Sequence, residues 1–252
     1  MRMYCMLGCS LAILLHLTTL EVKAQTDAPV VLPKEVEDYA REFKRVQSPT
    51  RLERNIEVLY QKGIVAGKKL LDHVGLSELT LLEKMDEEQL GATRRALPGI
   101  FLNREEILQA VPDPESFLEF AVKWGDRADI AFFSTLQMSY SSPGWPLYII
   151  PLTDYGGCRR LGSFVFSEIY GRWRAFQSRF PNRYKEQVLR EINRLEENIL
   201  HTSACEGPRE VAEAYREFIR SFPDAPVSEE IRRRISEIDD GTSKLRFNKA
   251  SR

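Results

Sequence analysis

Cysteine and histidine are scarce in this sequence of 252 residues, which contains four Cys and three His. Charge of one sign is not in excess either, because 36 Lys and Arg stand against 37 Asp and Glu. Nucleic-acid-binding proteins normally carry a strongly basic face, so this balance predicts no nucleic-acid partner. The sequence has no Cys-x-x-Cys, no paired histidines, no phosphate-binding glycine loop and no nucleophile elbow. These absences predict no metal site and no cofactor.

The composition is otherwise that of an ordinary globular protein. Hydrophobic residues make up 43% of the chain and charged residues 29%, which excludes a disordered class. We predict a single α-helical domain, with a separate N-terminal helical subdomain as the alternative division. The predicted segments are a signal peptide (1–24), a lead-in (25–33), the domain (34–238, divisible into 34–111 and a hairpin region 112–238) and a flexible tail (239–252).

The N-terminus has the layout of a secretory signal peptide. Arg2 supplies a basic start, residues 7–20 are mostly apolar, and small residues at Val22 and Ala24 precede a cleavage point before Gln25. The alternative is an uncleaved anchor, although the apolar run is shorter than the about 20 residues that a membrane span needs. No later stretch is long and apolar enough to span a bilayer. The sequence therefore predicts a periplasmic or secreted protein with no transmembrane segment after cleavage.

Cleavage changes how the cysteines are interpreted. Cys5 and Cys9 leave with the signal peptide, so Cys158 and Cys205 remain. An even number of cysteines in an oxidising compartment favours a disulfide. Two alternatives stay open: two free buried thiols, or a nucleophilic Cys205 with His201 as its base.

Apolar spacing predicts helices through the first half of the chain. Residues 34–46 carry apolar side chains three and four positions apart. Ser48-Pro49 resembles a helix start, and the apolar pattern behind it predicts a long helix that ends near Gly75. Inside this helix, Gly63 and Gly67 either break it or allow another helix to pack closely. Shorter helices are expected over 77–84 and 87–97.

Two further signals predict helix starts after residue 97. Asn103 with Glu106 resembles a capping box, and Asp113 before a proline is a typical N-cap. No clear alternation of apolar and polar residues occurs before residue 146. We therefore expect an all-α structure up to that point.

Three later segments share one aromatic spacing. Each has aromatic residues at positions i, i+3 and i+7, which lie on one helix face, followed by a helix-breaking residue and then Asp or Asn. Each segment therefore predicts the first helix and turn of a helical hairpin, with second helices at 127–139, 184–201 and 227–238. The three sets are Phe117, Phe120 and Trp124; Trp173, Phe176 and Phe180; and Tyr215, Phe218 and Phe222.

The last of these segments, AYREFIRSFPDAP at 214–226, resembles the tetratricopeptide-like hairpins of bacterial envelope proteins. The resemblance covers residues 211–238 well, 170–195 moderately and 117–139 loosely, although the repeats are unevenly spaced. It implies stacked antiparallel hairpins that offer a concave surface to peptides or partner proteins, and it implies no catalytic residues.

A segment rich in proline, glycine and aromatic residues, 139–161, interrupts the helices. Its three prolines and three glycines prevent a continuous helix, and 147–150 is expected to be extended. Long ordered connections are often functional. We therefore predict a binding site for a protein, a peptide or an envelope polymer here, with a purely structural lid as the alternative. The candidate binding residues are Trp145, Tyr148, Asp154, Tyr155, Arg159 and Arg160.

The sequence thus predicts a mainly α-helical, exported bacterial envelope protein that acts as a non-catalytic binding or structural module. The alternative function is a glycan hydrolase in which Asp154 and Glu168 act as base and acid. Such an enzyme needs the two carboxylates about 5–5.5 Å or 6.5–9.5 Å apart in a cleft.

Overall fold

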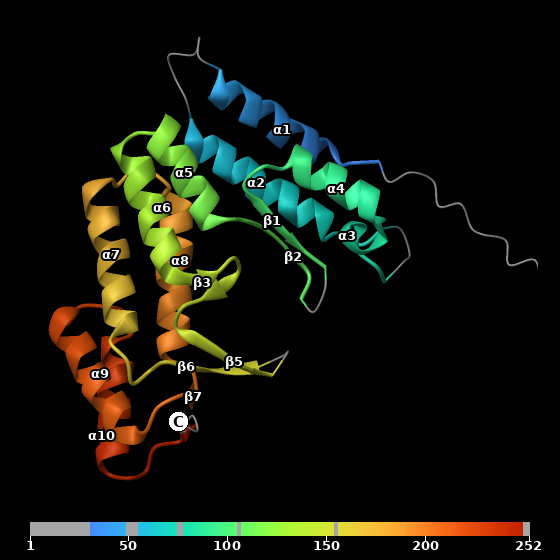
Figure 1. Ribbon diagram of the computed structural model, residues 1–252. Helices are drawn as coiled ribbons and strands as arrows, with labels where there is room; N and C mark the ends of the chain where they lie inside the picture. The colour runs from blue at the N-terminus through green and yellow to red at the C-terminus, as the bar shows by residue number, and fades with distance from the viewer. Residues whose placement is uncertain (1–30, 49–54, 75–77, 105–106, 154–155, 249–252) are drawn as a thin grey trace, which may run out of the picture.

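A computed structural model of the chain describes residues 31–48, 55–74, 78–104, 107–153 and 156–248 (Figure 1). The predicted signal peptide, most of the lead-in and the last four residues of the tail lie outside these ranges. Within them the chain forms ten helices and eight short strands. The prediction of a mainly helical protein is confirmed.

The first two helices pack against each other. Helix α1 covers Lys34–Gln47 and buries Val36, Tyr39 and Val46. Helix α2 covers Ile56–Leu70. Its N-cap is Asn55, whose side chain accepts a hydrogen bond from the Val58 N–H at 2.9 Å. Because Asn55 has a non-helical backbone, the long helix predicted from residue 49 is wrong, and residues 49–54 lie outside the described ranges.

Two short helices follow, each begun by a capping box. Thr80 caps α3, Leu81–Lys84, and Asp86 caps α4, Glu87–Ala96. In both, the N-cap side chain bonds the third backbone N–H of the helix while the third side chain bonds back to the cap. The two short helices are confirmed, although the first begins at Leu81 rather than at residue 77.

An antiparallel ribbon replaces the helix that we expected near Asn103. Strand β1, Ile100–Asn103, pairs with β2, Gln109–Pro112, and Asn103 lies opposite Gln109. The predicted capping box is wrong because Asn103 ends a strand. In β1 the exposed fractions alternate, from 8% at Ile100 to 36% at Phe101 and 6% at Leu102. This alternation spans too few residues to be distinct in the sequence.

The ribbon lies against α2 at two glycines. A Cβ at Gly63 would be 2.8 Å from Cδ1 of Ile100, and one at Gly67 would be 2.1 Å from the carbonyl oxygen of Ala110. Of the two alternatives for these glycines, close packing is therefore the correct one, since α2 continues through both. The partner that packs closely at Gly67 is a strand and not a helix.

Three helical hairpins form the rest of the helical body (Figure 1), as the aromatic spacing predicts. Asp113 accepts hydrogen bonds at the start of α5, and Asp126 does so at the start of α6. The first helix of each pair carries the aromatic stripe and packs on the second. The pairs are α5 (Pro114–Trp124) with α6 (Arg127–Ser139), α7 (Val165–Arg179) with α8 (Lys185–Ile199), and α9 (Pro208–Ser221) with α10 (Ser228–Asp239).

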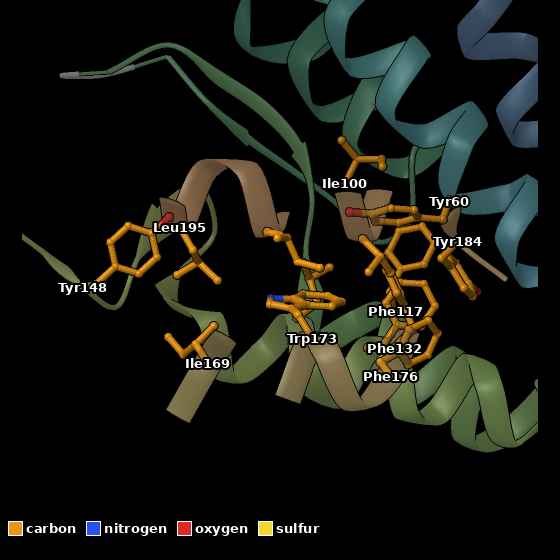
Figure 2. Packing of buried hydrophobic residues seen from close by; sticks show 14 of the residues in the cluster. Tyr60, Ile100, Phe117, Phe132, Tyr148, Ile169, Trp173, Phe176, Tyr184 and Leu195 are labelled. Atoms are coloured by element: carbon orange, nitrogen blue, oxygen red, sulfur yellow. The ribbon is translucent and has the colours of Figure 1, made fainter. Parts of the chain in front are cut away.

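The aromatic side chains build a continuous core between these elements. Tyr60 of α2 contacts Phe117 and Phe132 edge to face, and Phe132 stacks on Tyr184 with ring centroids 3.8 Å apart. Figure 2 shows the buried side chains continuing through Trp173 to Tyr148. Aromatic pairs of this kind add to the energy of burial. The buried residues of α1, α2 and the ribbon belong to the same cluster as those of the hairpins.

The interruption at 139–161 forms strands, and a disulfide fixes its end. Cys158 is bonded to Cys205, with their Cα atoms 5.0 Å apart, so the predicted disulfide is confirmed. Both cysteines are buried. The segment contains four strands: β3 (Tyr140–Ser142), β4 (Trp145–Pro146), β5 (Ile149–Thr153) and β6 (Gly156–Arg159). Strands β5 and β6 belong to a four-stranded sheet in the order β5-β6-β7-β8, which also contains β7 (Ser203–Ala204) and β8 (Arg246–Phe247).

Strand β8 lies within residues 239–252, for which the sequence predicts a flexible tail. The Arg246 N–H donates to the carbonyl of Thr202, and the Asn248 N–H donates to that of Ala204, both at 2.8 Å. The tail is short and polar, but it pairs with backbone groups that β7 leaves available.

No helix in the described part of the chain combines the length and the apolar character that crossing a bilayer requires. The buried disulfide is compatible with an oxidising compartment.

Candidate ligand-binding cavity

A cavity of about 390 Å³ lies where α2, the ribbon, α6, the β3–β4 turn and α8 meet. Its walls are mainly apolar. A mostly apolar cavity with a few convergent polar groups is the usual form of a small-molecule site. The apolar lining residues are Tyr60, Ile64, Leu71, Ala110, Val111, Pro112, Pro114, Phe132 and Leu136.

One polar cluster in the wall joins the end of α6 to the middle of α8. The Tyr140 hydroxyl lies 3.0 Å from both oxygens of the Glu191 carboxylate and donates to it. The Arg194 guanidinium donates to the same hydroxyl and lies 3.5 Å from Oε1 of Glu191. These three residues are called the Arg194 cluster. All three line the cavity.

Burial changes the protonation of this cluster. Burial raises the pKa of Glu191, while Arg194 and the Tyr140 hydroxyl act against that rise. Burial and the nearby Glu191 charge raise the pKa of Tyr140. Titratable groups with shifted pKa values beside a cavity are typical of functional sites.

Two further cations line the cavity and make its lining basic. Lys68 of α2 forms no salt bridge with any described residue, whereas the adjacent Lys69 pairs with Asp72 at 2.8 Å. Arg190 of α8 lies 3.9 Å from the exposed Glu186 and also interacts electrostatically with Glu191. Three basic side chains therefore stand against one carboxylate in the lining.

Gln187 and Gly144 complete the lining. Gln187 is 5% exposed, and its buried Oε1 has no hydrogen-bond donor among the described residues. Gly144 has a φ of +80°, which L side chains rarely adopt, and forms the turn between β3 and β4. The segment 139–161 thus reaches the cavity through Tyr140 and Gly144.

No protein-family model, no curated protein and no solved structure matches this chain. Any functional proposal therefore depends on the geometry of the cavity and on the sequence.

Four of the six predicted loop residues are described by the structure, and none of these four lines the cavity. Tyr148 is 2% exposed and packs on Phe166, with its hydroxyl unpaired. Arg159 donates to Oδ1 of Asn198 at 2.9 Å. Trp145 and Arg160 are partly buried, and Asp154 and Tyr155 lie outside the described residues. A binding site made by these six residues stays a prediction.

Glu168 of the hydrolase alternative lies in a different place. It is on α7, 57% exposed and 3.3 Å from Arg172. It borders a surface hollow together with Phe164 and Glu217, apart from the cavity lining. Its proposed partner Asp154 is not described, so the separation of the two carboxylates is not defined.

A second polar cluster occupies the opposite ends of α6 and α8. Arg183 donates to Glu57 at 3.0 Å and to Asp126 and Asp129 at 2.6 Å. The Tyr184 hydroxyl also donates to Asp129, at 2.7 Å. We call these five residues the Arg183 cluster. None of them borders the cavity, and they tie three helices together.

A polar stripe on α8 is the sequence signal for the cavity, and it is not among the predicted site residues. Gln187, Arg190, Glu191 and Arg194 follow at i, i+3, i+4 and i+7 and so share one helix face. That face lies beside the buried apolar stripe of the same helix. A polar stripe of this kind is usually solvated, and only the fold shows that its side chains border a cavity.

Proposed function

We propose that the protein is an exported, non-catalytic binding module that holds a small, largely apolar ligand in the cavity. The observation that carries this proposal is the apolar cavity of about 390 Å³ beside the buried carboxylate of Glu191. A buried carboxylate is costly unless it is hydrogen-bonded, and Tyr140 and Arg194 supply that bonding.

The rest of the proposal comes from the sequence. The signal-like N-terminus supports export, and the disulfide is compatible with it. The hairpin resemblance supports a bacterial envelope location and a scaffold similar to tetratricopeptide hairpins. In this proposal the hairpins form the frame, and the ligand is a small molecule rather than a peptide on a concave surface.

The test uses N-phenyl-1-naphthylamine, a neutral probe whose fluorescence rises in apolar surroundings. We expect saturable binding with one probe per chain. Ile64→Trp places a large ring at the cavity wall and should abolish that binding. The matched control is Val65→Trp, since Val65 is the next residue on α2, is 47% exposed and does not line the cavity.

Equal binding by the two variants would overturn the proposal. Absence of probe binding to the unmodified protein, with its far-UV circular dichroism that of a folded helical protein, would overturn it as well.

A further inference from the structure

We infer that the ligand is a single-chain amphiphile with an anionic end, of the class of a free medium-chain carboxylate. This inference rests on the proposed function and adds the chemistry of the ligand. It comes from three observations: the size of the cavity, its apolar walls and the position of its cations.

The volume limits the size of the ligand. A cavity of about 150 Å³ lined by apolar side chains binds benzene, which has six carbons. By that scale, 390 Å³ holds on the order of 15 non-hydrogen atoms. A chain of medium length fits this limit.

The cations define the ligand's polar end. Lys68 belongs to α2 and Arg190 to α8, so they reach the cavity from two different helices. Lys68 makes no salt bridge within the described residues, although Asp72 is close enough to interact with it electrostatically. Arg190 lies 3.9 Å from the exposed Glu186 and also interacts electrostatically with Glu191. A carboxylate between two incompletely paired cations forms charge-assisted hydrogen bonds, which are stronger than neutral ones.

Three acidic groups lie near the two cations, and they do not cancel this preference. Glu191 already interacts with Tyr140 and with Arg194. Glu186 is 83% exposed and pairs weakly with Arg190, so solvent screens it. Asp72 is half-exposed and already pairs with Lys69 at 2.8 Å. The cations therefore remain available to an anion, whereas an ammonium ligand would meet Lys68 and Arg190 unfavourably.

The experiment compares three competitors that share one chain and differ in charge. Octanoate, octanamide and octylammonium displace N-phenyl-1-naphthylamine from the purified, oxidised protein at pH 7 and low salt. We expect octanoate to compete at roughly tenfold lower concentration than octanamide, and octylammonium to compete least. Added sodium chloride should narrow the difference between octanoate and octanamide.

Charge-neutral variants test which residues are responsible. Lys68→Gln with Arg190→Gln should remove the preference for octanoate over octanamide. Lys69→Gln is the matched control, because it removes an adjacent cation that pairs with Asp72 and does not line the cavity.

The outcomes separate the two proposals. If the probe binds but octanamide competes as well as octanoate, or octylammonium competes best, the inference on ligand charge is wrong and the binding function stands. If the double variant keeps the preference, Lys68 and Arg190 are not its cause and the inference fails. If neither the probe nor any competitor binds, the proposed function fails too.

Discussion

Two clusters of tyrosine, carboxylate and arginine occur along the same pair of helices, and they differ in what surrounds them. In the Arg183 cluster, one guanidinium meets three carboxylates, of which Asp129 is buried, and no member lines the cavity. In the Arg194 cluster, one guanidinium meets one carboxylate and one hydroxyl beside an open space. The residue types are the same, but the excess charge around the second cluster is positive.

The difference teaches how to separate a structural polar cluster from a functional one. Asp129 is buried, and its carboxylate accepts hydrogen bonds from Arg183, from the Tyr184 hydroxyl and from the N–H of Asp126, the last at 2.9 Å. Tyr184, the one described non-glycine residue with a positive φ, is held by two hydrogen bonds to acidic groups. These interactions complete the fold. The Arg194 cluster instead leaves cations on its border incompletely paired.

The largest expected effect is on the Arg183 cluster. Arg183→Met removes the charge that compensates Asp129, which is 3% exposed as a side chain. Removing one partner of a buried ion pair leaves an uncompensated charge, so we expect a loss of about 3 kcal/mol in the free energy of unfolding, measured with urea. The control is Arg172→Met, whose exposed pair with Glu168 should matter by less than about 0.5 kcal/mol. Equal losses would remove the distinction between buried and exposed pairs.

The next effect concerns the wall of the cavity. Gly67→Ala would place a methyl group 2.1 Å from the carbonyl oxygen of Ala110 and push β2 away from α2. We expect a loss of about 2 kcal/mol together with weaker probe binding, by urea unfolding and fluorescence titration. Gly91→Ala is the control: its new methyl group meets only Arg95 at 3.5 Å, so it should raise stability by about 0.5 kcal/mol or more. Normal probe binding by the Gly67 variant would show that β2 does not shape the site.

The smallest effect is the pH dependence of the Arg194 cluster. Burial raises the pKa of Glu191 above its unfolded value, so the folded state takes up a proton more readily than the unfolded state. Its contribution to stability is therefore fully present below the ordinary pKa of 4.5 and is lost as pH rises through the folded pKa. The stability of the unmodified protein should fall relative to that of Glu191→Gln as pH rises from 4.5 to 8, in urea titrations.

A matched carboxylate separates this effect from the general titration of the protein. Glu197→Gln removes an exposed acid from the same helix, and its stability should follow that of the unmodified protein at every pH. A constant difference between Glu191→Gln and the unmodified protein would contradict the assignment of a shifted pKa to Glu191.

The helix starts at Asp113 and Asp126 and the disulfide were predictable because their signals are local or countable. Asp113 and Asp126 act within three residues of themselves, so the sequence alone identifies them as caps. Cys158 and Cys205 are the only two cysteines after the predicted signal peptide. The aromatic spacing also predicted the hairpins, since side chains three and four apart share a helix face.

The ribbon and the cavity could not be predicted because they depend on tertiary contacts. The alternation of buried and exposed residues around Ile100 and Leu102 is too short to predict a strand. The need for glycine at position 67 becomes clear only from the structure, where Ala110 lies against it. Lys68 and Arg190 are far apart in the sequence, and only the packing of α2 near α8 places both at one cavity. The aromatic composition of residues 139–161 favours a binding site in that segment, but composition does not show which side chains are exposed. Tyr148, for example, is buried.

The β1–β2 ribbon makes the scaffold adaptable. It supplies Ala110, Val111 and Pro112 to the cavity, while Ile100 and Leu102 of β1 are buried in the core and hold the ribbon against the helices. Substitutions at the cavity-lining positions of β2 would therefore reshape the pocket while the helical frame stays intact. Directed evolution for a new ligand would begin most efficiently on this strand.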